Sequence, residues 1–176
     1  LLVYTSLLDV RKTPQVDLTD PGGIVRSQVV ETMNGMLRIA LNASQSPRTQ
    51  SSRFLNEYFG SGVQHIAFAT DDILATAARL KANGVETLRI PENYYDDLEA
   101  RTGLDAARLK LLKDNNVLYD KDDSGEYLQL YTKSFKDLFF LEIVQRRGYK
   151  GFGAINAPIR LNAQSRLAGG STVSGL

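Results

Sequence analysis

Three polar side chains stand inside apolar, strand-like segments of this sequence, and together they could bind a metal ion. The histidine His65 lies in the run VQHIAFA, Gln129 lies in YLQLY, and Glu142 lies in FFLEIV. A carboxylate inside an apolar strand costs free energy unless it is paired, protonated or bound to a metal. Imidazole and carboxylate with open positions form the ligand set of non-haem iron oxygenases, which normally use a second histidine.

The same residues also have ordinary structural explanations. His65 could be a hydrogen-bonded core residue, and Glu142 could form a salt bridge with Arg146 or Lys133. The chain has a single histidine, so a site that needs two imidazoles cannot be completed within its 176 residues. From the residues alone, both the metal site and the structural explanation stay open.

Composition excludes several classes of function. The net charge is +1 at pH 7 and Lys and Arg are dispersed, so the chain has no basic stripe for nucleic acid. It has no cysteine, which excludes disulfides and thiolate metal sites and fits a reducing cytoplasm. No apolar run approaches the roughly 20 residues of a membrane-spanning helix. We therefore expect a cytoplasmic domain that contacts neither nucleic acid nor membrane.

Hydrophobic periodicity predicts the elements that must position the three polar residues. A helical pattern at 73–82 has Asp71 and Asp72 at its start, and 94–113 predicts a helical insert that Gly103 interrupts. Strand patterns occur at 63–69, 85–90, 117–121, 127–132 and 138–145. We expect 63–69 to be buried, and the predicted order is β-α-β, the helical insert, then β-β-β.

The N-terminal third predicts a hairpin followed by a helix. Strands at 24–31 and 36–42 flank the turn Met33-Asn34-Gly35, and a short helix at 50–59 should end at Gly60. The opening residues LLVYTS carry neither a Met nor a basic segment and are typical of a strand entered midway. We therefore expect the chain to be part of a longer polypeptide.

Five ordered motifs resemble 4-hydroxyphenylpyruvate dioxygenases. They are GVQHIA (62–67), NYYDDL (93–98), YLQLYTK (127–133), FLEIVQR (140–146) and GFG (151–153). The resemblance implies an α+β fold of the vicinal oxygen chelate type, whose βαβββ modules enclose one metal. It implies an incomplete N-terminal module with its connecting helix at 1–60 and a second module with a helical insert at 61–168. Residues 169–176 are expected to be a disordered tail.

The same resemblance implies roles for single residues. His65 and Glu142 match two of three metal ligands, and the third, a histidine, would lie ahead of residue 1. The positions that match substrate-binding residues are Ser27, Asn42, Gln50, Gln64, Gln129 and Phe140. The implied cofactor is a divalent metal, Fe(II) in a dioxygenase and Mg, Mn or Co otherwise. The implied ligand is a small aromatic or hydroaromatic acid.

Other segments depart from the dioxygenase pattern. Ala157 and Leu161 stand where two phenylalanine rings would cover the substrate, which removes stacking of roughly 0.5–1.5 kcal/mol each. The segments NASQSPRT (42–49), GSG (60–62) and INAPIRL (155–161) are instead similar to bacterial two-domain 3-dehydroshikimate dehydratases. In that family a TIM barrel carries the dehydratase site, and a dioxygenase-like domain is fused behind it.

Three hypotheses follow from these resemblances. The chain could be the C-terminal, metal-binding domain of a 3-dehydroshikimate dehydratase whose chemistry lies in a barrel outside these residues. It could instead be a working, Fe(II)-dependent 4-hydroxyphenylpyruvate dioxygenase that forms homogentisate. It could finally be a non-catalytic structural or oligomerisation module. We expect the parent protein to be a homo-oligomer.

Overall fold

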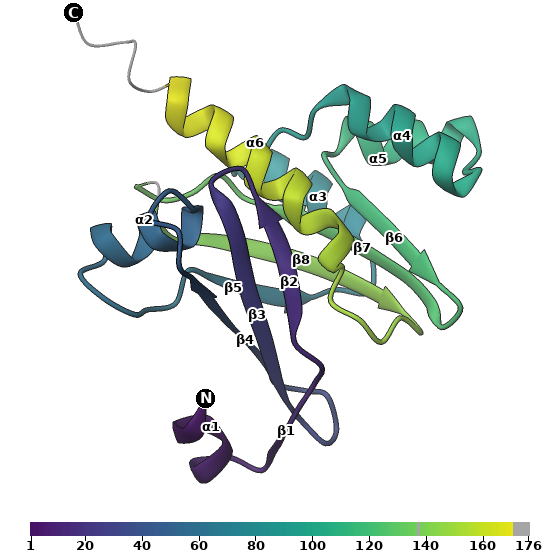
Figure 1. The fold of residues 1–176 in the computed structure, drawn as a ribbon. Helices are drawn as coiled ribbons and strands as arrows, with labels where there is room; N and C mark the ends of the chain where they lie inside the picture. The colour runs from purple at the N-terminus through teal and green to yellow at the C-terminus, as the bar shows by residue number, and fades with distance from the viewer. Residues whose placement is uncertain (137, 171–176) are drawn as a thin grey trace, which may run out of the picture. The chain divides into compact units, whose positions relative to one another are not determined.

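The computed structural model describes residues 1–136 and 138–170, and the chain divides into two compact units, Leu1–Gly60 and Ser61–Leu176. Each unit is built around one four-stranded sheet (Figure 1). None of the helices in the described part is long and apolar enough to span a membrane.

The sheet of the N-terminal unit has one long central strand. The elements are α1 (Leu2–Leu7), β1 (Val10–Lys12), β2 (Val16–Asp20), β3 (Gly23–Thr32), β4 (Arg38–Ser44) and α2 (Gln50–Glu57). β3 pairs antiparallel with β1 and β2 and with β4. The predicted hairpin is therefore confirmed, and Gly35 supplies the positive φ of 68° in its turn. The strand expected at the first residues is wrong, because LLVYTS begins α1.

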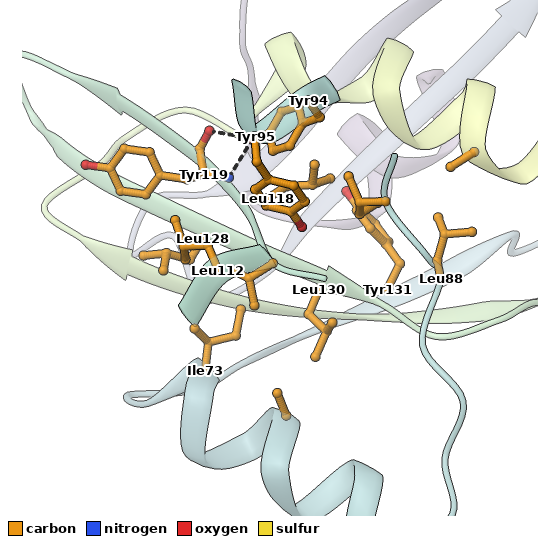
Figure 2. Close-up of a cluster of buried hydrophobic side chains, with 14 of the residues drawn as sticks. Ile73, Leu88, Tyr94, Tyr95, Leu112, Leu118, Tyr119, Leu128, Leu130 and Tyr131 are labelled. Carbon is orange, nitrogen blue, oxygen red and sulfur yellow. Dashed lines mark hydrogen bonds between the residues drawn. The ribbon is translucent and has the colours of Figure 1, made fainter. Parts of the chain in front are cut away.

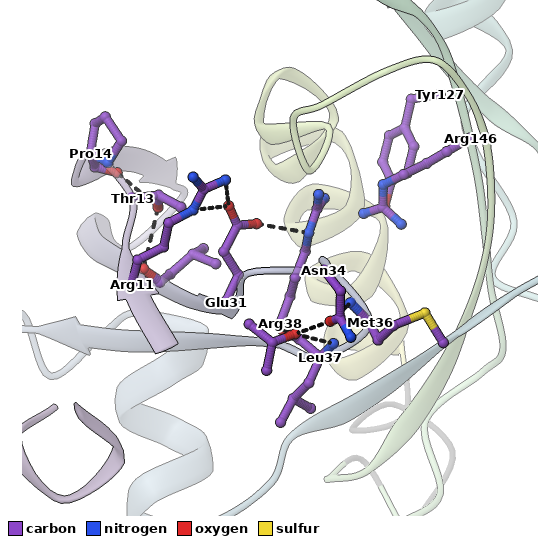
Figure 3. Close-up of polar contacts among 12 residues, drawn as sticks. Arg11, Thr13, Pro14, Glu31, Asn34, Met36, Leu37, Arg38, Tyr127 and Arg146 are labelled. Carbon is purple, nitrogen blue, oxygen red and sulfur yellow. Dashed lines mark hydrogen bonds and ion pairs between the residues drawn. The ribbon is translucent and has the colours of Figure 1, made fainter. Parts of the chain in front are cut away.

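A buried carboxylate on β3 is neutralised by two arginines. Glu31 is 8% exposed, and its two oxygens lie 2.9 Å from Nη2 of Arg11 and 3.0 Å from Nε of Arg38 (Figure 3). Arg11 comes from β1, which pairs with β3 at this position, and Arg38 begins β4. The three charges tie the strands together, so this cluster has a structural explanation.

The second unit contains the βαβββ order, which confirms the expected fold. Its elements are β5 (His65–Ala69), α3 (Ile73–Ala82), α4 (Glu92–Thr102), α5 (Ala106–Asp114), β6 (Leu118–Asp122), β7 (Gly125–Tyr131), β8 (Phe140–Arg147), η1 (Ala154–Asn156) and α6 (Ala157–Gly170). The strand order is β5-β8-β7-β6, with β5 parallel to β8 and the other pairs antiparallel. Helices α4 and α5 form the insert between α3 and β6.

Local capping residues explain where these helices begin and end. The side chain of Asp72 accepts a hydrogen bond of 2.9 Å from the backbone N–H of Ala75 and so caps α3, as expected. Gly103 adopts φ 64° at the end of α4, and Asp105 then caps α5 through the N–H of Arg108. The interruption predicted at Gly103 is thus a genuine boundary between two helices.

Three expectations about elements are corrected by the structure. Residues 85–90 form no strand of their own: Thr87 makes an isolated bridge to Thr132, and the apolar alternation reflects burial of Leu88 and Ile90 in the core. The strand at 63–69 is an edge strand with large side chains exposed, not a buried one. Helix α6 runs through Gly170, two residues into the expected tail, while 171–176 lie outside the described residues.

The core of the second unit lies where α3, α4 and α5 meet the sheet. Ile73 of α3 and Leu112 of α5 pack with Leu128 and Leu130 of β7, as Figure 2 shows. Because side chains alternate along a strand, these two leucines point away from the face that carries Gln129. The packed face holds β7 in place, and the opposite face is available for polar side chains.

Candidate metal and substrate site

His65 begins β5 and is held by an aromatic neighbour. In the parallel register it lies beside Phe140, the first residue of β8. The imidazole stacks on the Phe140 ring at 4.8 Å between centroids, with 7° between the two planes. The backbone N–H of Phe140 also donates to the carbonyl of Gln64, which fixes the start of the edge strand. The ring is thus oriented before any ligand arrives.

Glu142 lies on the same face of the sheet, on the neighbouring strand. It is 6% exposed, and its Oε1 accepts a hydrogen bond of 2.9 Å from Nε2 of Gln129 on β7. Its Oε2 lies 3.6 Å from Nε2 of His65. The structure therefore brings together the three polar residues that the sequence placed in apolar strands.

The surroundings of His65 and Glu142 shift the pKa values of both side chains. Burial, together with the positive charge of Arg160, lowers the pKa of His65 to about 4, so the imidazole is neutral near pH 7. Burial raises the pKa of Glu142, while hydrogen bonds from Gln129 and Tyr131 oppose that rise. The contact between His65 and Glu142 is therefore not an ion pair at neutral pH.

These two side chains fit part of a divalent metal site. A neutral imidazole and a carboxylate are common ligands of divalent metals. Two bonds of about 2.0–2.2 Å to one ion leave the ligand atoms roughly 3–3.5 Å apart, close to the 3.6 Å between Nε2 and Oε2. Within residues 1–136 and 138–170, no group of three His, Cys, Asp or Glu side chains is arranged to bind a metal. In such a site the pair would supply two ligands, and a third would have to come from elsewhere.

The amide of Gln129 is fully engaged by buried neighbours. Its Nε2 donates to Glu142 and, at 2.8 Å, to the hydroxyl of Tyr131, and its Oε1 accepts from Nδ2 of Asn156 at 2.9 Å. Oδ1 of Asn156 accepts from the hydroxyl of Tyr94, which is anchored on the backbone of Tyr119. A chain of hydrogen bonds thus runs from α4 to the Glu142 carboxylate.

The salt bridges that would have explained Glu142 without a metal are absent from the described residues. Arg146 donates to the hydroxyl of Tyr127 and lies over its ring, 4.6 Å from the centroid (Figure 3). Lys133 pairs with Glu86 at 3.0 Å. The structural explanation by either partner is therefore wrong.

The remaining predicted substrate residues are divided between the two units of the chain. Phe140 is buried beside His65, whereas no hydrogen bond in the described part joins the side chain of Gln64 to the buried network. Ser27 and Asn42 face each other across β3 and β4 in the N-terminal unit. Gln50 opens α2, where its backbone N–H donates to Asp20. Substrate-binding roles for all of these residues stay predictions.

Pattern reasoning missed three residues of this site. Tyr131 and Asn156 lie inside quoted motifs, but their hydrogen bonds depend on contacts across the fold. Arg160 lies on α6 with its guanidinium carbon 5.4 Å from the centroid of Phe140 and 5.7 Å from that of Tyr131. The sequence indicates Arg160 only through its apolar neighbours Ile159 and Leu161, which suggest that a charged side chain is buried there.

The known proteins with sequences similar to this chain include two kinds of enzyme. The 3-dehydroshikimate dehydratase of Pseudomonas putida is 45% identical over 173 residues, which cover 97% of this chain and 27% of that protein. The 4-hydroxyphenylpyruvate dioxygenase of Pseudomonas aeruginosa is 40% identical over 155 residues, 87% of this chain and 43% of that protein. The chain thus spans about a quarter of the first relative and under half of the second.

A solved structure and a family profile agree with these relatives. The structure of a xylose isomerase-like TIM barrel/4-hydroxyphenylpyruvate dioxygenase fusion protein superimposes with a TM-score of 0.77 at 44% identity, over 94% of this chain and 26% of that one. The profile of the glyoxalase/bleomycin resistance protein/dioxygenase superfamily matches residues 3–115. That match covers most of the chain. This chain therefore belongs to the glyoxalase/bleomycin resistance protein/dioxygenase superfamily.

Proposed function

We propose that this chain is the dioxygenase-like, metal-binding part of a bacterial 3-dehydroshikimate dehydratase. The observation that carries the proposal is the 45% identity to such a dehydratase along 97% of the chain. The similarity to a TIM barrel/dioxygenase fusion protein supports it, because a fused barrel would supply the dehydration site. The parent protein would then convert 3-dehydroshikimate to protocatechuate.

The residues of this chain support a dehydration site elsewhere. Loss of water next to a ketone needs a base for the α-proton and an acid or metal that stabilises the enolate. His65 and Glu142 are the candidate metal ligands, and the amide of Gln129 is engaged. Every lysine in the described part of the chain is exposed. Among the described residues no lysine is therefore buried to act as the base, and the buried carboxylates of Asp20 and Glu31 are already bonded.

A divalent metal at His65 and Glu142 is part of this proposal. Fe(II) would suit dioxygenase chemistry, whereas Mg, Mn or Co would serve a site that only orients a small aromatic or hydroaromatic acid. When bound, the ion would supply Lewis acidity. The chain itself contributes a neutral imidazole, a carboxylate fixed by Gln129, and an aromatic wall from Phe140.

The test separates this site from dehydration in the full-length protein. We expect Glu142→Ala to lower the metal content by about one ion per chain while the rate of protocatechuate formation, followed by absorbance, stays near that of the wild type. Glu86→Ala, which removes an exposed carboxylate, is the control. Dehydration by residues 1–176 alone, or its complete loss in a folded Glu142→Ala protein, would overturn the proposal.

The second candidate is a 4-hydroxyphenylpyruvate dioxygenase, favoured by the 40% identity to that enzyme. Against it, Ala157 and the buried Leu161 stand where the resemblance places two rings over the substrate. We expect little or no homogentisate from 4-hydroxyphenylpyruvate in the presence of Fe(II). Oxygen uptake near the typical enzyme rate of about 10 s⁻¹ would establish the dioxygenase instead.

A further inference from the structure

Arg160 is a buried positive charge beside the candidate site. It lies on α6, is 8% exposed, and is flanked in sequence by apolar residues. Its guanidinium lies against the rings of Tyr131 and Phe140, and the Phe140 ring is the one on which His65 stacks. The guanidinium and the imidazole of the candidate metal ligand therefore contact the same aromatic ring.

The charge of Arg160 lacks a close carboxylate partner. Its one hydrogen bond in the described part of the chain runs from Nη1 to Oε1 of Gln164, at 2.7 Å. No described Asp or Glu oxygen lies within 4.0 Å of it, and Glu142 is bonded instead to Gln129. Contact with the aromatic rings offsets only part of the cost of burying a cation. The bond to Gln164 uses one of the five guanidinium N–H donors.

We propose that Arg160 binds the carboxylate of a small aromatic or hydroaromatic acid beside the His65–Glu142 pair. A guanidinium offers two parallel N–H donors that match the two oxygens of a carboxylate. The rings of Phe140 and Tyr131 hold the guanidinium in place next to His65, so a carboxylate bound to Arg160 would lie close to the candidate metal ligands. The hydrogen bond to Gln164 would hold the guanidinium group in its orientation. This inference rests on the proposed function for its class of ligand.

The rival explanation makes Arg160 a purely electrostatic neighbour. Its charge adds to the lowering of the His65 pKa and opposes the rise that burial causes in the pKa of Glu142 and of Tyr131, so it could serve only as a charge near Glu142. That role needs only a positive charge, whereas carboxylate recognition also needs the paired N–H donors of the planar guanidinium. Arg160→Lys keeps the charge and removes the paired donors, so it separates the two explanations.

The experiment measures ligand binding to the metal-free full chain by calorimetry. The probes are 3,4-dihydroxybenzoate and its neutral analogue 3,4-dihydroxybenzamide, and EDTA removes any metal that could bind either. We expect the wild type to bind the acid more tightly than the amide. Arg160→Met should weaken binding of the acid by about 10- to 100-fold and leave the amide nearly unchanged. Arg160→Lys should fall between the wild type and Arg160→Met.

A matched variant controls for the loss of charge from α6. Arg166→Met makes the same substitution at an exposed arginine of that helix and should leave both affinities unchanged. Equal affinities of the wild type and Arg160→Met for the acid, equal affinities of the wild type for acid and amide, or no binding at millimolar concentration would each overturn the inference. No probe is turned over, so a parent protein that fails to dehydrate 3-dehydroshikimate would refute the proposed function and leave this measurement standing.

Discussion

Asn156 connects the candidate metal ligand to the body of the second unit. It is 1% exposed, donates to Gln129, and accepts from Tyr94. Since the amide oxygen of Gln129 is held by Asn156, its nitrogen must point at Glu142 and Tyr131. The carboxylate therefore keeps its orientation because of a residue that does not touch it.

We expect Asn156→Ala to weaken metal binding at the site. The change leaves the buried amide oxygen of Gln129 without its partner, which costs about 1–3 kcal/mol of folding free energy, while the Tyr94 hydroxyl keeps its bonds to the backbone of Tyr119. Gln129 is the outer partner of Glu142, and because loss of such a partner typically lowers metal affinity about 10- to 100-fold, loosening it should lower affinity by less than that. Titration with Co(II) and urea denaturation measure the two effects. The control is Asn162→Ala, an exposed asparagine of α6; unchanged Co(II) affinity in a folded Asn156→Ala protein would contradict the role.

Two adjacent buried tyrosines give a second prediction. The Tyr94 hydroxyl bonds to the backbone of Tyr119 and to Asn156, whereas the Tyr95 hydroxyl has no hydrogen-bond partner among the described residues (Figure 2). Tyr94→Phe should therefore lower the free energy of unfolding by about 1–3 kcal/mol. Tyr95→Phe should leave it unchanged or raise it. Chemical denaturation compares the two, and an equal loss in both variants would show that Tyr95 has a partner.

The candidate metal pair was predictable because its members break the apolar pattern of their strands. A histidine in VQHIAFA and a glutamate in FFLEIV need a partner wherever the strands lie. Arg160 was not predictable in this way, because its neighbours Tyr131 and Phe140 come from distant segments. Sequence patterns identify buried polar groups on one strand, but not the charge that another element brings to them.

At the scale of elements, one carboxylate joins a helix and three strands. Glu126 of β7 accepts from Nη2 of Arg108 on α5 at 2.8 Å and from the hydroxyl of Tyr119 on β6 at 2.6 Å. Arg147 on β8 lies 3.6 Å away. The hydrogen bond from Arg108 is the main reason that the pKa of Glu126 lies below its ordinary value of 4.5. The cluster fixes α5 against the sheet.

The lowered pKa of Glu126 predicts how stability depends on pH. A carboxylate whose pKa is lower in the folded state stabilises the fold above its unfolded pKa and loses that contribution as pH falls through the folded value. Glu126→Gln should therefore be less stable than the wild type near pH 7, by about 1 kcal/mol for this partly exposed cluster. The difference should shrink below about pH 4.5. Glu99→Gln on the exposed side of α4 is the control; a difference independent of pH would refute the charge-based explanation.

Elements with local determinants were predicted well. The β3–β4 hairpin has its turn glycine, and α3 has its capping Asp72, so both follow from a few neighbouring residues. Residues 85–90 were misassigned because alternation records burial of Leu88 and Ile90 and not pairing with another strand. Strands β1 and β2 were not predicted at all. They are short, carry charged residues, and depend on pairing with β3.

At the scale of the whole molecule, each unit of the chain has its own four-stranded sheet. The second unit contains the candidate metal ligands, while Ser27, Asn42 and Gln50 belong to the first. The chain matches 27% of the dehydratase and 43% of the dioxygenase to which it is similar. A third metal ligand and the expected homo-oligomer are therefore predictions about the proposed parent protein.

The last prediction concerns metal affinity in the chain and in its proposed parent. Catalytic metal sites normally have three protein ligands, whereas the described residues offer the pair His65 and Glu142. We expect residues 1–176 to bind Co(II), Mn(II) or Fe(II) weakly and the longer parent to bind them more than about tenfold more tightly, a gain above roughly 1.4 kcal/mol. Calorimetry on both proteins measures this gain. Glu142→Ala should abolish it in the parent, because a third ligand is of little use without the second, whereas equal affinities of the two wild-type proteins would mean that no further ligand exists.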